Sequence, residues 1–421
     1  NLIVEFLPVI GMTATTINDT FIFNMEAVGQ TKFRQFISYD TMDEPNQALT
    51  SLLFADYQLE NKMNIGFVGS PNIGSVAPNM IKDSEEFKAF ANVFGEGDRI
   101  FFISSIFGGT GAAGFPILVK NIRQAQNLDV SNKNFLRQAP IGGLTVLPYF
   151  NLNNSQGKSI DKADFVVKTQ SALQYYNETL TGDADRNVNA IFYLGDQTSS
   201  IPYDYDPGNI RDQHNPAHLV EMVGAMAALK FAGMADRQFL DGMGGFLPTK
   251  AFEYGLDKDL LDVDFTTFGQ ETRHLIYRPM VKFHMLFIYM RTALKAIIGQ
   301  GYTQDEPKIR SEFTTTQFYR TLVDQFFDFY TEWLTEMHQN LRHVELFNVG
   351  ENNLSNIIHN VVTKKGFFGR KSVDENTFNS EMNKLSRDNK KYSDRTVEYK
   401  LLDLFNQAAG NILDEKYENI N

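Results

Sequence analysis

The segment Asp98-Arg-Ile-Phe-Phe-Ile-Ser-Ser-Ile-Phe-Gly-Gly-Thr-Gly-Ala-Ala-Gly-Phe-Pro116 joins an apolar run, a glycine loop and a helical pattern. Residues 100–103 predict a buried strand, 108–111 the loop, and the apolar spacing over 112–122 a helix. Glycines let the backbone approach an anion closely, and the free N–H groups at a helix start attract negative charge. The order strand, glycine loop and helix therefore favours a phosphate site and nucleotide binding.

Apolar runs alternate with helical patterns through the first two thirds of the chain. Strands are predicted at 36–39, 63–68, 143–147 and 189–194, and helices at 84–94 and 160–180. This alternation is typical of an α/β fold whose parallel sheet has helices on both faces. Ligands of such sheets bind at the carboxyl ends of the strands, where Asp- and Gly-rich turns follow in this chain.

A long helix is expected at about 215–232, because Asn215 suits the N-cap and Pro216 the first helical position. Residues 233–250 are rich in glycine and are predicted to be irregular. Beyond residue 271 the patterns are helical, at 273–298, 314–341 and 397–417. We therefore expect two domains: an α/β nucleotide-binding domain over residues 1–270 and a mainly helical domain over 271–421.

Composition excludes several classes of partner. The formal net charge of −12 over 421 residues argues against nucleic acid, which needs a positive field. The absence of cysteine fits a reducing compartment, and we expect a cytoplasmic protein. The most apolar region, 280–290, is interrupted by Lys282 and His284, so no transmembrane segment is expected.

Two other interpretations of the glycine loop stay open. Gly109-Thr-Gly-Ala-Ala-Gly114 matches G-x-G-x-x-G, the motif that binds NAD in Rossmann folds. Its acidic ribose ligand would correspond to Asp129, although the residues before Asp129 do not form an apolar strand. A tight turn without any ligand is the remaining interpretation.

Three further groups of residues invite a functional hypothesis. Thr363-Lys-Lys-Gly-Phe-Phe-Gly-Arg-Lys371 is either an exposed loop or a segment that docks to an acidic partner or a membrane surface. Asp262-Val-Asp-Phe265 carries two carboxylates that could position a water or a metal ion. His214 and His218 are four residues apart, but the expected helix start falls between them, so no metal site is predicted.

Together these segments resemble the tubulin/FtsZ superfamily. Its phosphate loop, G-G-G-T-G-[ST]-G, follows a strand and opens a helix, as the segment at 107–113 does here. Phe107 stands in place of the first glycine, and Ala112 lacks the hydroxyl of the family residue. The resemblance assigns the phosphate cradle to Gly108, Gly109, Thr110, Gly111, Ala112 and Ala113.

The flanking turns follow the order of the same family. Residues 38–43 resemble the turn after the second strand, 69–75 the loop that faces the terminal phosphate, and 146–150 the turn near the ribose. The residue that opens the long helix resembles the Asn that reads the guanine edge. The resemblance therefore implies further nucleotide contacts from Asp40, Asp43, Gly69, Asn72 and Asn215.

Leu261-Asp-Val-Asp-Phe265 resembles the catalytic loop N-x-D-F, with Asp262 in place of the Asn and Asp264 in place of the Asp. Thr267 stands where FtsZ-like proteins carry another Asp. In the family this loop completes the nucleotide pocket of the next subunit. The resemblance thus implies a divergent prokaryotic member that binds GTP and Mg²⁺, hydrolyses GTP slowly through Asp262 and Asp264, and self-associates into a filament or oligomer.

Two alternatives to this function are kept. A non-hydrolysing regulatory or scaffold protein would bind nucleotide and meet a protein partner through its helical domain. Ala112 and Thr267, which lack the family's hydroxyl and carboxylate, favour it. An NAD-dependent enzyme would need a hydride-transfer site, which the sequence does not reveal.

Overall fold

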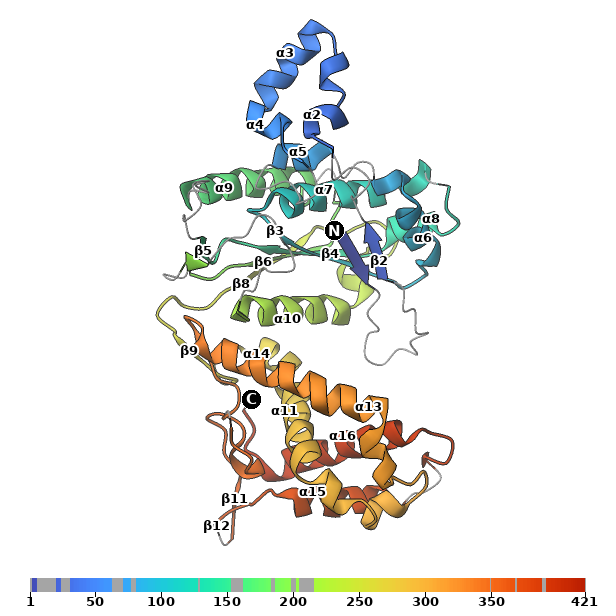
Figure 1. Cartoon of the computed structure of the whole chain (residues 1–421), viewed down its shortest axis with the longest axis vertical. Coiled ribbons are helices and arrows are strands. Elements are labelled where there is room, and N and C mark those ends of the chain that lie inside the picture. The colour runs from blue at the N-terminus through green and yellow to red at the C-terminus, as the bar shows by residue number, and fades with distance from the viewer. Residues whose placement is uncertain are drawn as a thin grey trace. The chain divides into compact units, whose positions relative to one another are not determined.

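A computed structural model of the chain is shown in Figure 1. It describes residues 2–5, 20–23, 31–62, 71–76, 81–127, 129–152, 162–182, 186–197, 202–203, 216–348, 350–367, 369–387 and 391–420. The chain divides into two compact units, the first made of Asn1–Asn215 with Met222–Lys258 and the second of Pro216–Glu221 with Asp259–Asn421. Residues 216–221 and 259–270, which were expected in the first domain, lie in the second unit.

The first unit contains a four-stranded parallel sheet. Its strands are β3 (Ile100–Ser105), β4 (Ile141–Val146), β6 (Ala190–Leu194) and β8 (Lys250–Tyr254), in the order β3-β4-β6-β8. The first three confirm predicted strands, and the α/β class with a parallel sheet is confirmed with them. The fourth strand was not predicted, because its sequence Lys-Ala-Phe-Glu-Tyr is short and partly charged.

Helices cover both faces of this sheet, as predicted. One face bears α7 (Gly109–Arg123), and a side chain on Gly143 of β4 would overlap the ring of its Phe115. The other face bears α10 (Leu219–Gly233), whose Phe231 lies 2.8 Å from where a Cβ on Gly142 would be. Two successive glycines in the strand therefore admit a ring from each side. Figure 1 shows the two helices on opposite sides of the sheet.

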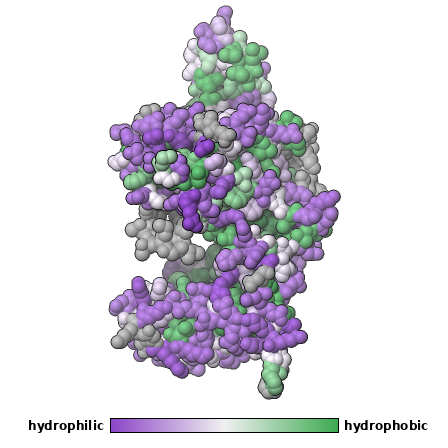
Figure 2. Space-filling view, turned by 180° about the vertical axis from the view of Figure 1, so that it is seen from behind, coloured by the Kyte–Doolittle hydropathy of each residue, from purple (hydrophilic) through white to green (hydrophobic). Residues whose placement is uncertain are grey.

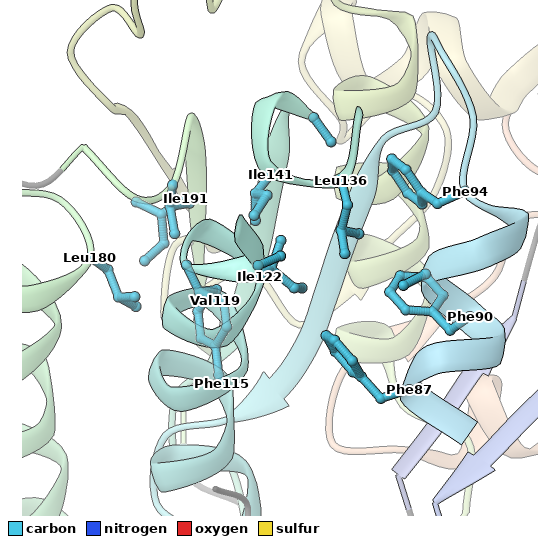
Figure 3. Packing of buried hydrophobic residues seen from close by; sticks show 14 of the residues in the cluster. Phe87, Phe90, Phe94, Phe115, Val119, Ile122, Leu136, Ile141, Leu180 and Ile191 are labelled. Atoms are coloured by element: carbon cyan, nitrogen blue, oxygen red, sulfur yellow. The ribbon is translucent and has the colours of Figure 1, made fainter. Parts of the chain in front are cut away.

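A single apolar cluster packs between the sheet and the helices on the α7 face (Figure 3). The helices that contribute to it are α6 (Glu85–Val93), α7, α8 (Lys133–Gln138) and the end of α9 (Lys162–Thr179). The helix predicted at 84–94 is confirmed as α6, and Ser84 caps it by accepting a hydrogen bond from the Phe87 N–H. The helix predicted at 160–180 corresponds to α9.

Arg99 fixes the end of α10 to the start of β3. Its guanidinium donates to the carbonyls of Phe231 (3.0 Å), Ala232 (3.1 Å) and Met234 (2.6 Å). A helix leaves its last carbonyls without intrahelical partners, and a cation favours this negative end. The Asp236 carboxylate, 2.6 Å from the same guanidinium, completes the contact.

The remaining described strands and α-helices of the first unit have ten residues or fewer. They are β1 (Leu2–Glu5) paired antiparallel with β2 (Thr20–Phe23), α2 (Phe33–Phe36), α3 (Glu44–Leu53), α4 (Asp56–Leu59), α5 (Pro71–Val76), and β5 (Asn151–Leu152) paired parallel with β7 (Pro202–Tyr203). The strand predicted at 36–39 is wrong. Phe33 and Phe36 share one face of α2, and their rings stack with centroids 6.4 Å apart. The apolar residues here therefore follow the spacing of a helix and not that of a strand. The strand predicted at 63–68 lies outside the described residues.

The second unit is mainly helical, as predicted. Its helices are α11 (Gln270–Thr292), α12 (Leu294–Ile297), α13 (Gln317–Tyr319), a π-helical segment (Arg320–Phe326), α14 (Phe327–Gln339), α15 (Glu375–Leu385) and α16 (Val397–Lys416). Two short strand pairs were not predicted: β9 (Asp262–Val263) lies parallel to β10 (His343–Val344), and β11 (Lys365–Gly366) forms a hairpin with β12 (Gly369–Arg370). Among the described residues, no helix is long and apolar enough to cross a bilayer.

Candidate functional site

The glycine loop lies where the sequence analysis predicted it, between β3 and α7. The helix begins at Gly109, and Gly108 is its N-cap. A Cβ on Gly111 would lie 3.0 Å from the Ser105 carbonyl oxygen and 3.2 Å from the Ser104 Cβ. A larger residue there would press on the Ser105 backbone and force its neighbours to shift by a few tenths of an ångström, so glycine lets the first turn of α7 rest directly on the end of β3.

The start of α7 offers N–H groups to an anion. Gly108 has an extended backbone (φ −85°, ψ 160°), and as the N-cap it supplies no side-chain hydrogen bond to the first turn. The first turn holds no acidic residue, whereas Lys120 and Arg123 occupy the last turn. The positive end of this fifteen-residue helix therefore has no acidic residue of its own to offset it. Such an end attracts phosphate.

The two alanines of the loop face the core. Ala112 and Ala113 are both buried, and the Ala112 carbonyl accepts a 2.9 Å hydrogen bond from the Tyr176 hydroxyl. Thr110, by contrast, is exposed at the second helical position. Of the residues assigned to the phosphate cradle, the exposed Thr110 is therefore the one whose side chain can approach a ligand.

The carboxyl ends of the strands meet beside this loop. Phe107, which follows β3, packs edge-to-face on Phe150, which follows β4, with ring centroids 5.4 Å apart. The Leu147 N–H donates to the Leu194 carbonyl (2.8 Å), and the Gly195 N–H donates to the Tyr254 carbonyl (3.1 Å). The strand ends are thus held in register at one edge, the usual position of a ligand on a parallel sheet.

A row of polar residues crosses the sheet below this edge, and the sequence analysis missed it. Ser104, Thr145, Tyr193 and Glu253 are neighbours in the strand register. Thr145 is fully buried, and its hydroxyl has no hydrogen-bond partner among the described residues. Burial raises the pKa of the Tyr193 phenol, and the negative charge of Glu253 raises it further. The only sequence signal was that the second-to-last residue of each strand is polar or phenolic.

Three predicted nucleotide contacts have local structural roles. Asp40 forms an ion pair with Arg34, and Asp43 caps α3 by accepting a 2.9 Å hydrogen bond from the Asn46 N–H. Asn72 lies on α5, which packs against α7. Its amide donates to the Leu53 carbonyl at 3.2 Å, which ties α5 to the end of α3. The described hydrogen bonds of these three side chains do not reach the glycine loop.

Two other predicted contacts, Gly69 and Asn215, lie outside the described residues, as does His214. The helix expected at 215–232 is observed at Leu219–Gly233. Residues 216–218 are not helical, so the assignment of Asn215 as the N-cap of this helix is wrong. The carboxylate of Glu336 instead accepts a 2.9 Å hydrogen bond from the Ala217 N–H just before the helix.

The predicted catalytic loop belongs to the second unit, and its two aspartates differ sharply. Asp262 lies on β9 with 91% of its side chain exposed, 3.4 Å from Nδ1 of His343 on the neighbouring β10. Asp264 is engaged in a turn: its carboxylate accepts hydrogen bonds of 2.6 Å from the Thr266 N–H, the Thr266 hydroxyl and the Asn360 amide.

These contacts set the ionisation of Asp264. Partial burial acts to raise the pKa of this carboxyl, but the hydrogen bonds from Asn360 and the Thr266–Thr267 turn outweigh it and lower the pKa. Thr267, which stands where the family carries another Asp, closes the turn by accepting a 2.6 Å hydrogen bond from the Asp264 N–H. Asp264 is thus an ionised anchor of the turn.

Comparisons of the chain with protein-family models, with curated proteins and with solved structures find no match. Within the described part of the chain, no three His, Asp or Glu side chains gather in a way that could hold a metal ion. The acidic residue that an NAD site needs is also misplaced. Asp129 lies between α7 and α8, before β4 begins, whereas the Rossmann ribose ligand follows a strand.

Proposed function

We propose that this chain binds GTP at the edge formed by the carboxyl ends of β3, β4 and β6, and hydrolyses it slowly in a self-associated state. The observation that carries the proposal is the uncapped start of α7. Gly108 supplies no side-chain oxygen, and Gly111 brings the first turn against β3, so backbone N–H groups point out of a rigid frame. The aromatic pair of Phe107 and Phe150 borders the same edge.

Magnesium enters this proposal with the nucleotide. Mg²⁺ in phosphate sites keeps several waters and takes most of its other ligands from phosphate oxygens. It therefore does not require a ready-made cluster of carboxylates. Bound in this way, it would offset phosphate charge beside the start of α7, where positioning and electrostatics account for most of phosphoryl-transfer catalysis.

Self-association is part of the proposal because of Asp262. Its carboxylate is 91% exposed on a short strand that is fixed by pairing with β10. An exposed and well-positioned carboxylate is suited to act on a second molecule, where it could orient a water against a bound nucleotide. Asp264 would contribute by holding the loop that presents Asp262.

The second candidate, a non-hydrolysing scaffold, is favoured by the same loop. The carboxylate of Asp264 is occupied by hydrogen bonds from Thr266 and Asn360, so it is not available to polarise water. A protein that kept nucleotide binding and lost turnover would show this arrangement. Its helical unit would then serve to meet a protein partner.

Thr110→Asp gives a sharp test of binding. An acidic residue in the first turn favours the helix dipole, so we expect the variant to be as stable as the wild type or more so by about 0.3–1 kcal/mol. The added charge should nevertheless weaken GTP binding by about a hundredfold or more, because it repels the phosphates at close range. Thr110→Asn, of the same shape but neutral, is the matched control and should bind nearly as well as wild type.

The binding measurement is a titration with fluorescent GTP and Mg²⁺, with ATP and NAD as competitors. Equal binding by Thr110→Asp and Thr110→Asn would refute the site. Turnover is measured separately as phosphate released per chain at rising protein concentration. Release that rises steeply with concentration and is lost in Asp262→Asn supports the assembling GTPase, whereas binding without release at every concentration supports the scaffold.

A further inference from the structure

The hairpin of β11 and β12 exposes an aromatic side chain at its tip. Phe367 lies between the two strands and is 96% exposed, among the highest values for an apolar residue in the described part of the chain. The hairpin projects beyond the rest of the second unit (Figure 1), and the projecting tip is coloured as apolar in Figure 2. A large apolar side chain held in water in this way marks an interaction site more often than a chance exposure.

The base of the hairpin is firmly attached to the end of α16. The Lys364 N–H donates to the Lys416 carbonyl at 2.6 Å, and the Glu418 N–H donates to the Val362 carbonyl at 3.0 Å. The two strands are closed by a 2.9 Å hydrogen bond from the Lys371 N–H to the Lys364 carbonyl. The tip is therefore held on a fixed base, so binding a partner requires little further loss of conformational entropy in the hairpin.

The same hairpin carries a local positive charge in an acidic chain. Residues 361–373 hold Lys364, Lys365, Arg370 and Lys371 and no acidic residue, although the whole chain has a net charge of −12. Carboxylates lie near three of these cations, with Glu418 at 3.8 Å from Arg370, Glu415 at 3.9 Å from Lys371, and Asp414 close enough to Lys364 for its charge to lower the pKa of Asp414. Exposed ion pairs at such distances contribute little to stability, so anionic groups of a partner can take the place of these carboxylates.

We propose that this hairpin is a membrane-contact element, which places Phe367 in the headgroup region of an anionic bilayer while Lys365 and Arg370 contact lipid phosphates. Aromatic and basic side chains together are the combination that partitions to such an interface. A protein partner is less suitable, because a specific interface covers about 800 Å² on each side and two strands of two residues cannot supply that area. The proposal stands independently of nucleotide binding.

The test is co-sedimentation of the full chain with vesicles of phosphatidylcholine, with and without phosphatidylserine. We expect binding to the anionic vesicles, weakened by salt. Phe367→Ser should lower the affinity about tenfold, since it removes the apolar contact. The double variant Lys365→Gln with Arg370→Gln should lower it about 25-fold, at about fivefold for each cation near the surface.

Matched controls lie elsewhere on the surface. Met243→Ser removes another apolar side chain that is 94% exposed, and Lys384→Gln removes an exposed cation of α15. Both should bind vesicles like the wild type, and unchanged thermal melts of all variants exclude misfolding as the cause. Leu52, exposed on α3, is the alternative apolar residue through which the chain could contact the vesicles.

Three outcomes would overturn the proposal. The first is that the wild type fails to bind anionic vesicles at low salt. The second is that Leu52→Ser abolishes binding while Phe367→Ser does not, which would place the contact on α3. The third is that the chain binds soluble polyglutamate as strongly as anionic vesicles and that Phe367→Ser does not weaken this binding. That result would assign the hairpin to an acidic macromolecule.

Discussion

His284 is a buried histidine that should make the second unit sensitive to acid. Only 3% of its surface is exposed, its ring stacks on Phe347 with centroids 4.0 Å apart, and Nδ1 lies 3.0 Å from the hydroxyl of Tyr330. Burial lowers the pKa of His284 to about 3, from 6.5 in the unfolded chain. No carboxylate is among these contacts, so the charged ring would have no compensation in the folded state.

The sign and size of the effect follow from these two pKa values. Between pH 6.5 and pH 3 the unfolded chain binds a proton at this position and the folded chain does not, so acid favours unfolding. Each pH unit in this window is worth about 1.4 kcal/mol. Lowering the pH from 7.5 to 5.0 should therefore reduce the free energy of unfolding by about 2 kcal/mol through His284 alone.

Urea unfolding followed by tryptophan fluorescence measures this directly, because the single tryptophan, Trp333, lies on α14 in the same unit. His284→Gln keeps a hydrogen-bond acceptor near Tyr330 but cannot titrate. We expect the wild type to lose about 2 kcal/mol more than His284→Gln over this pH range. His274→Gln, at an exposed position of α11, is the control: its free energy of unfolding should fall with pH by as much as that of the wild type. Equal losses in wild type and His284→Gln would refute the reasoning.

Three other substitutions test the packing. Lys400→Met should lower the stability of the second unit by about 3 kcal/mol in urea, because the fully buried ammonium donates to three backbone carbonyls that would lose their partner. Gly143→Ala should destabilise the first unit by about 1–3 kcal/mol, because the added Cβ overlaps the ring of Phe115. The loss is measured as a lower melting temperature. Asp264→Asn should cost about 1 kcal/mol at pH 7 in urea, and its difference from the wild type should shrink as the pH falls below 3.8, because hydrogen bonds hold the pKa of the Asp264 carboxyl below that of the unfolded chain.

The elements with a strong local signal could be predicted from the sequence. The strand at Ile100–Ser105 begins with an unbroken apolar run, and α16 shows a clean helical spacing, so both were expected near their observed bounds. The strand β8 could not be predicted, because its charged residues Lys250 and Glu253 are tolerated only at the sheet edge. Its position depends on pairing with β6, which is a tertiary effect.

The candidate site was predictable only in part, for a similar reason. The glycine loop was recognisable because Gly111 meets a local steric demand that any strand-to-helix turn of this kind imposes. The states of Asp262 and Asp264 depend on residues about eighty to a hundred positions away, since His343 pairs with the first and Asn360 with the second. No spacing in the sequence reveals which of two neighbouring carboxylates will be exposed and which will be bound.

The glycine pair in β4 has a consequence for how this chain can diverge. Gly142 leaves room for Phe231 from one side, and Gly143 leaves room for Phe115 from the other. A side chain added at either glycine would require its aromatic neighbour to shrink or move, so the two positions of each pair are energetically coupled. We expect related chains to exchange glycine and aromatic together. That coupled signature would identify distant relatives after the surrounding residues have changed beyond recognition.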